Sequence, residues 1–188
     1  LWLRIKPQTD LELLNALSAL LVARKGYDPA FVERYTAGFN ALETSLGLLD
    51  LARVCRITGL DIRALEKTVE LLRGKKPAIV VGSGILQQKY AMHSLSAIMN
   101  LLLMSGGLGV AGAGIYLLAG ENNQIGAMDM GSTPDLLPGR MPLAQERVRR
   151  AWEQRWNARL SSHPGLTVAG MLAAAEKGTL KALYVMGE

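Results

Sequence analysis

Short apolar runs alternate along the chain with longer segments in which apolar residues recur every three or four positions. The clearest short run is Ala-Ile-Val-Val at 78–81, which stands between a proline and two glycines. A β-branched run of this length is typical of a strand that is buried on both faces. Residues 1–5 and 181–186 are two further predicted strands. Strands separated by helices predict a parallel sheet with helices on both of its faces.

Polar capping residues divide the remainder into helices. Helices are predicted to begin near Thr9, Asp28, Leu48 and Asp61. Thr9 and Glu12 fit a capping box, in which each side chain bonds a free backbone N–H group of the first turn. Asp28 followed by Pro29 supplies an N-cap and a proline at the first helical position.

Residues 91–104 form the most apolar predicted helix, with three polar side chains at His93, Ser96 and Asn100. We expect this helix to be mostly enclosed, and His93 to serve structure rather than catalysis. No acidic or basic residue occurs from Tyr90 to Gly120. The glycines that follow the helix could not satisfy their backbone in lipid, so we predict a helix buried in protein and no membrane span.

Composition is that of an ordinary globular domain, with 188 residues, 49% hydrophobic and 20% charged. We therefore predict a single domain over residues 1–188. The chain has no initiator methionine, and we expect it to be excised from a larger protein. Its one cysteine, Cys55, excludes an internal disulfide and a CxxC metal or redox pair, and favours a reducing compartment.

Basic residues are concentrated late in the chain. The arginines of this cluster are Arg140, Arg147, Arg149, Arg150, Arg155 and Arg159. Such a helix is usually a solvated face, here held through Trp152 and Trp156 four residues apart, but it could also dock an acidic partner subunit. Nucleic-acid binding is disfavoured, because aromatic residues are scarce and the cluster is confined to one helix.

The turn after the 78–81 strand is the first candidate for chemistry. Gly82, Ser83 and Gly84 let backbone N–H groups converge ahead of a helix, which suits a phosphate. The same pattern also occurs in any tight turn from strand to helix. Gln87 stands where a Rossmann fingerprint has its third glycine, so an ordinary NAD domain is disfavoured.

A polar loop is the second candidate. Gly120 is followed by Glu121, Asn122 and Asn123, whose side chains can read the hydrogen-bonding edge of a base or a pterin. Alternatively, the asparagines cap the backbone of their own loop. Asp129 and other isolated polar residues are expected to serve caps and turns, and no segment combines a nucleophile, a base and an orienting group. We predict no catalytic residue and no metal ligand in this chain.

Four motifs in order resemble the molybdopterin oxidoreductases. The matching segments are 82–87, 103–109 with 112–114, 120–131 and 137–139. The resemblance is greatest to formate dehydrogenase alpha chains and to the large molybdopterin-type subunit of NADH-quinone oxidoreductase, the respiratory complex I. It implies a three-layer αβα, Rossmann-like domain, which helps to hold molybdopterin guanine dinucleotide.

In this resemblance the glycine turn corresponds to Gly82, Ser83 and Gly84, with Gln87 directed toward the pterin. The loop Gly120, Glu121, Asn122 and Asn123 lies near the cofactor and the substrate channel. The residue that ligates the metal, and the cysteines of the iron–sulfur clusters, are expected upstream in the full-length chain.

Two positions depart from the formate dehydrogenase pattern. Ala119 replaces an arginine that helps to position formate, and Glu121 replaces a glutamine. Loss of the guanidinium removes a bidentate partner for a small carboxylate. The departures favour the large subunit of NADH-quinone oxidoreductase and a role in electron transfer from NADH to quinone, with the molybdenum cofactor retained or lost. A cofactor-binding domain of a formate dehydrogenase alpha chain is one alternative, and a subunit-docking module without cofactor is another.

The NADH-quinone oxidoreductase interpretation implies that the partners are other domains of the same chain and other subunits of a membrane-associated redox complex. The expected location is cytoplasmic, peripheral to the inner membrane through those subunits. The chain by itself is predicted to be inactive.

Overall fold

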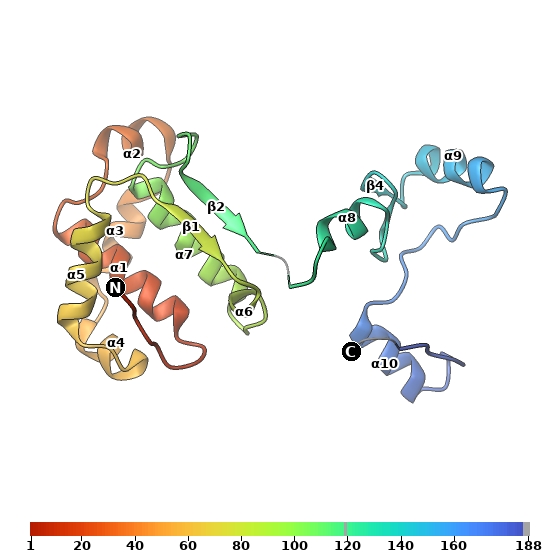
Figure 1. Cartoon of the computed structure of the whole chain (residues 1–188), viewed down its shortest axis with the longest axis horizontal. Helices are drawn as coiled ribbons and strands as arrows, with labels where there is room; N and C mark the ends of the chain where they lie inside the picture. The colour runs from red at the N-terminus through yellow and green to blue at the C-terminus, as the bar shows by residue number, and fades with distance from the viewer. Residues whose placement is uncertain (119, 186–188) are drawn as a thin grey trace. The chain divides into compact units, whose positions relative to one another are not determined.

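The computed structural model describes residues 1–118 and 120–185. The chain divides into two compact units, Leu1–Gly120 and Glu121–Glu188 (Figure 1). The single domain predicted over residues 1–188 stays a prediction.

The first unit is built around helix α1 (Asp10–Ala23). Its other helices are α2 (Pro29–Tyr35), α3 (Phe39–Gly47), α4 (Leu51–Thr58), α5 (Ile62–Leu72), α6 (Ser83–Leu86) and α7 (Ala91–Met104). Helix α1 packs against α3, α4, α5 and α7. The buried core cluster consists of Ala16, Leu17, Leu20, Leu21, Val54, Leu65, Val69, Leu101 and Met104. These residues come from α1, α4, α5 and α7, so the core of this unit is helical.

Aspartate caps begin several of these helices. Asp28 accepts a hydrogen bond from the Phe31 N–H, and Asp61 accepts one from the Arg63 N–H, which confirms both predicted N-caps. The predicted capping box at Thr9 is wrong. The Thr9 hydroxyl instead donates to the backbone oxygen of Lys6 at 2.7 Å, and Glu12 Oε2 is buried without a hydrogen-bond partner. Thr9 makes no side-chain hydrogen bond to the first turn of α1, and its hydroxyl bonds the preceding backbone instead.

The sheet of the first unit has two parallel strands, β1 (Ala78–Val81) and β2 (Gly114–Leu117). The register pairs Ala78 with Gly114 and Val81 with Leu117. The predicted strand at 78–81 is confirmed, but its predicted burial on both faces is wrong. Val81 is buried, whereas Val80 is 60% exposed and its neighbour Tyr116 is 49% exposed. Within the described residues, the face that carries Val80 and Tyr116 has no covering layer.

The other two predicted strands do not form. Residues 1–5 and 181–185 have no strand conformation, and Met186 lies outside the described residues. Trp2 is 80% exposed and Tyr184 is 87% exposed. A strand requires a hydrogen-bonded neighbour, which an apolar pattern alone does not supply. The unit is therefore mixed α/β with a small parallel sheet.

Helix α7 is confirmed, and its predicted enclosure is confirmed in part, because one stripe of the helix is exposed. Its buried residues are Ser94, Ala97, Ile98, Leu101, Leu102 and Met104, which define one face. Met92 is 71% exposed and His93 is exposed on the other face. The absence of charge therefore did not mean burial on all sides. Among the described residues, we find no helix with the length and apolarity needed to cross a membrane.

The second unit is small and mostly exposed. It contains α8 (Gln124–Asp129), the antiparallel pair β3 (Leu136–Leu137) and β4 (Met141–Pro142), α9 (Glu146–Trp156) and α10 (Val168–Glu176). In its described part Leu137 is the buried hydrophobic residue. Trp152 and Trp156 of α9 lie with ring centroids 4.8 Å apart, and Trp156 is 47% exposed. The tryptophans contact each other, and no residue of α9 is buried.

Candidate functional site

The glycine turn follows β1 directly. Gly82 is the N-cap of α6, with φ −78° and ψ 162°, a conformation open to any residue. A Cβ atom added to Gly82 or to Gly84 would meet no other atom within 4 Å. Neither the backbone nor the packing of this chain therefore requires glycine at these positions. The space in front of the turn is open.

Hydrogen-bonding groups at this turn are available. The N–H groups of a first helical turn, here including Ser83 and Gly84, have no acceptor inside their helix. Within the described residues, the side chains of Ser83 and Gln87 have no hydrogen-bond partner. Gln88, in contrast, donates to Asp10 Oδ2 at 2.7 Å and so holds the end of this segment to α1. The segment that follows the turn is therefore held to α1 through Gln88, while the hydrogen-bond donors of the turn itself remain free.

The polar loop begins in the first unit, at Gly120, and continues into the second with Glu121, Asn122 and Asn123. Ala119, on which the comparison with formate dehydrogenases depends, lies outside the described residues. All four loop residues are exposed. A Cβ atom on Gly120 would meet no atom within 4 Å.

Asn123 adopts the left-handed conformation, with φ 56°, and caps α8 with its carbonyl oxygen, which accepts the Ala127 N–H. Its side chain makes no cap hydrogen bond, so the alternative of asparagine side chains that cap their own loop is not seen at Asn123. A Cβ atom on Gly126 would clash with Asn123 Oδ1. The absence of a side chain at Gly126 therefore leaves space for the side-chain amide of Asn123.

The structure brings together Gly82, Ser83, Gly84 and Gln87 on one turn. It places Glu121, Asn122 and Asn123 together on a separate unit. A common site formed by the turn and the loop is therefore a proposal.

Isolated polar residues singled out in the sequence are accounted for locally. Asp129 accepts a hydrogen bond from Arg140 Nε at 2.6 Å, and its backbone oxygen accepts the Gly139 N–H. His93 lies edge-on to Tyr90, with ring centroids 6.0 Å apart. In the described part of the chain, no group of three or more His, Cys, Asp or Glu side chains is placed to hold a metal ion.

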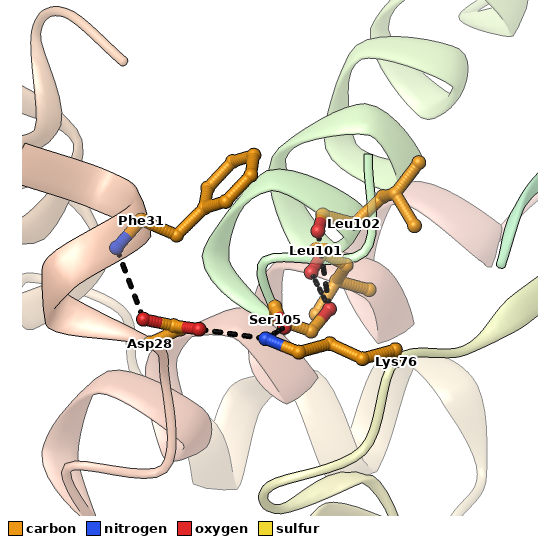
Figure 2. Close-up of polar contacts among 6 residues, drawn as sticks. All are labelled: Asp28, Phe31, Lys76, Leu101, Leu102 and Ser105. Atoms are coloured by element: carbon orange, nitrogen blue, oxygen red, sulfur yellow. Dashed lines mark hydrogen bonds and ion pairs between the residues drawn. The ribbon is translucent and has the colours of Figure 1, made fainter. Parts of the chain in front are cut away.

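A polar cluster that the sequence did not reveal fixes the approach to β1 (Figure 2). Lys76 Nζ donates to Asp28 Oδ2 at 2.6 Å and to the backbone oxygen of Ser105 at 2.9 Å. Asp28 also caps α2, since its Oδ1 accepts the Phe31 N–H at 3.0 Å. The hydrogen bond from Lys76 lowers the pKa of the Asp28 carboxyl, and the Phe31 N–H adds to this effect. One lysine thus ties the start of β1 to α2 and to the end of α7.

A sizeable cavity lies away from the turn. It measures about 480 Å³ and is lined by residues of the α2–α3 region, with none from the glycine turn. The turn is an open surface, and its geometry alone does not identify a ligand.

Comparison with known proteins identifies the family of this chain. The family model described as "Molybdopterin oxidoreductase" matches residues 1–188. The chain therefore belongs to the molybdopterin oxidoreductase family, as the ordered motifs of the sequence indicated.

Several curated relatives of this chain are formate dehydrogenases by name. The chain is 33% identical over 189 residues to "Putative formate dehydrogenase YrhE" of Bacillus subtilis, covering 100% of this chain and 19% of that protein. It is 34% identical over 190 residues to "Probable oxidoreductase YjgC" of the same organism, with the same coverage. It is 28% identical over 189 residues to the "F420-dependent formate dehydrogenase subunit alpha" of Methanocaldococcus jannaschii, covering 28% of that protein.

Among solved structures, acetylene hydratase from Pelobacter acetylenicus matches with a TM-score of 0.56 and 26% sequence identity. That match covers 60% of this chain and 16% of the other. The chain spans about a fifth of the length of the first two curated relatives. The similarity to these relatives is therefore to one part of their length.

Proposed function

We propose that this chain is a cofactor-binding domain of a formate dehydrogenase-type oxidoreductase. The observation that carries the proposal is the family match over the whole chain. It is supported by the turn at Gly82 and Gly84, where the packing of this chain does not require glycine and the space in front is open. The names of the curated relatives favour this interpretation over the large subunit of NADH-quinone oxidoreductase. That subunit remains the alternative, supported by Ala119 and Glu121.

The cofactor that fits the available groups is molybdopterin in its guanine dinucleotide form. Its residues in this chain would be Gly82, Ser83, Gly84 and Gln87 on the turn, and Gly120, Glu121, Asn122 and Asn123 on the loop. Free backbone N–H groups suit a diphosphate, and amide side chains suit the edges of guanine and pterin. The bound molybdenum centre would supply the redox chemistry, while these residues bind and orient the cofactor. Glu121 would disfavour a second anion close to the loop.

The uncovered face of the small sheet supports a larger arrangement. Val80 and Tyr116 would lose exposed apolar area if the two strands belonged to the three-layer αβα, Rossmann-like domain that the resemblance implies. We also assign the iron–sulfur clusters and the metal ligand to other parts of the longer polypeptide. The chain alone is expected to show no turnover.

Substitution at the turn tests the proposal in the full-length polypeptide. The Cβ atoms that Gly82→Val and Gly84→Val introduce would meet no other atom of this chain within 4 Å. We expect both variants to fold but to lose most of their molybdenum, measured by metal analysis, and their pterin, measured by fluorescence after oxidative release. Gly47→Val on α3 is a matched control, since its added Cβ atom also meets no atom within 4 Å. Full molybdenum and pterin content in the turn variants would refute the proposed site.

A second candidate, subunit docking through α9, is favoured by its arginines, of which Arg147, Arg150 and Arg155 are exposed and Arg149 is half-buried. Arg150 pairs with Glu146 at 2.5 Å, and Arg155 lies 5.6 Å from the centroid of the Trp152 ring. In the described residues, Arg147 and Arg149 have no ion pair. The partner would be a subunit of a redox complex that is peripheral to the cytoplasmic side of the inner membrane.

Charge reversal tests this docking. A triple variant with glutamate at Arg147, Arg149 and Arg150 is expected to reduce co-purification of partner subunits with the full-length polypeptide. Glutamate at Arg63 and Lys67 on α5, two other exposed basic positions, is the control. Unchanged assembly of the triple variant would remove the docking candidate.

A further inference from the structure

The α2–α3 region carries a groove that the cofactor proposal does not use. A cavity of about 480 Å³ continues beside a smaller hollow of about 140 Å³, and the two share Val32, Thr36, Gly38 and Phe39. We name this pair of hollows the α2–α3 groove. Its smaller hollow reaches Leu103 and Met104 of α7. The buried residues Val32, in both hollows, and Met104, in the smaller hollow, form an apolar part of the floor.

The lining of the larger hollow is aromatic and acidic. Tyr27 and Phe39 line it and lie with ring centroids 4.9 Å apart. Glu33 and Glu43 also line it, and both are exposed. In the described part of the chain, neither carboxylate has an ion pair or a side-chain hydrogen bond. The nearby cation in the sequence, Arg34, lies over the ring of Tyr35, 5.2 Å from its centroid, and does not line either hollow.

We propose that the α2–α3 groove binds an arginine side chain presented by a protein partner. A guanidinium group can stack on an aromatic face and pair with carboxylates through its fixed fork of N–H donors. Its aliphatic stem would lie along the apolar floor. The combination of two unpaired carboxylates, two aromatic rings and apolar lining residues matches this side chain in charge and in chemical character.

The open rim favours a side chain carried on a polypeptide over a free small molecule. Pockets for small molecules usually enclose most of the ligand surface. Here Glu33, Gly38, Asn40 and Glu43 are all exposed. A segment that lies across the α2–α3 groove could insert one arginine and make further contacts with the rim.

A titration of the ¹⁵N-labelled chain, observed by NMR, tests the proposal. The probe is the peptide acetyl-Ala-Ala-Arg-Ala-Ala-amide, and the comparison peptide has citrulline, which is nearly isosteric but uncharged, in place of arginine. We expect the arginine peptide to shift the amide signals of Val32, Thr36, Gly38 and Phe39, and the citrulline peptide to leave them unchanged. Agmatine, the free cation, is expected to bind more weakly than the peptide.

Variants assign the effect to the rim. The double variant E33Q and E43Q is expected to weaken peptide binding by about three- to tenfold, as for two partly exposed ion pairs. E176Q at the end of α10 removes the same kind of exposed charge elsewhere, and should bind as the unaltered chain does. Both positions of the double variant are exposed, so its fold should survive, which circular dichroism checks.

Three results would overturn the proposal: equal binding of the citrulline peptide, undiminished binding by the E33Q and E43Q variant, or absence of shifts in the α2–α3 groove. Agmatine that bound as tightly as the peptide would identify a site for a free organic cation instead of a docking site. None of these outcomes depends on the molybdenum cofactor, so they are separate from the test at the glycine turn.

Discussion

At Gly106 both the backbone conformation and the neighbouring side chains disfavour any residue larger than glycine. Its φ of 63° lies in the left-handed region. An added Cβ would lie 2.5 Å from Lys76 Nζ and 2.7 Å from Asp28 Oδ2. Gly106→Ala is therefore expected to lower the free energy of unfolding by about 1–3 kcal/mol through strain, with a further loss from displacing the ion pair. Urea denaturation of the 188-residue chain measures the change.

Gly109→Ala is the matched control for that substitution. Gly109 has a φ of 80°, but its Cβ would meet no atom within 4 Å. It should show the conformational cost alone. Equal destabilisation by both substitutions would mean that the contact with Lys76 and Asp28 contributes nothing measurable.

Asp28 gives the first unit a pH dependence of defined sign. Its pKa is lowered from 3.8, first by the hydrogen bond from Lys76. A carboxyl whose pKa is lower when folded than when unfolded stabilises the fold above the unfolded value, and this stabilisation is lost as the pH falls through the folded value. Asp28→Asn keeps an N-cap but removes the charge. We expect the variant to be less stable than the unaltered chain at neutral pH, and the difference to shrink below about pH 4.

The control for this titration is Asp61→Asn, a second N-cap aspartate, which in the described residues has no ion pair. Denaturation curves from neutral pH down to about pH 2 would compare the two substitutions. A constant difference for Asp28→Asn across this range would contradict the role given to Lys76.

At the level of elements, sequence patterns identified those defined by local chemistry. Asp28 with Pro29, Asp61, and the 78–81 run each specify a helix start or a strand within a few residues. Strand formation at 1–5 and 181–185 failed because a strand depends on a neighbour far away in the sequence. Strand β2, which follows a glycine-rich segment, was not predicted from the sequence.

The candidate site likewise combines features that adjacent residues determine with contacts between residues far apart in the sequence. The turn at Gly82 could be predicted from adjacent residues, and the open space in front of it is a local property. The contact between Lys76 and Asp28 could not, because these residues are 48 positions apart in sequence. The α2–α3 groove was also missed, since it joins a loop, two short helices and the end of α7.

Helix α5 provides a direct test of where the core lies. Leu65 has no exposed surface, while Leu71 on the same helix is 58% exposed. Leu65→Ala is expected to cost about 2–5 kcal/mol of unfolding free energy, because it removes buried methyl groups and leaves a cavity. Leu71→Ala should cost less than about 1 kcal/mol. Thermal or urea denaturation measures the stability of both variants. Similar effects of Leu65→Ala and Leu71→Ala would show that α5 packs with another face.

For the whole molecule, the division into two units predicts that the first can fold alone. The core cluster and the hydrophobic residues packed on it lie between Leu13 and Met104. A polypeptide of residues 1–120 should therefore keep its helical circular dichroism, unfold cooperatively, and lose the same stability on Leu65→Ala as the 188-residue chain. A shorter polypeptide, 1–72, lacks α7 and with it Leu101 and Met104, so it should not unfold cooperatively. If 1–120 were instead as disordered as 1–72, the core would depend on residues of the second unit, and the helical cluster around α1 could not be the independent centre of the fold.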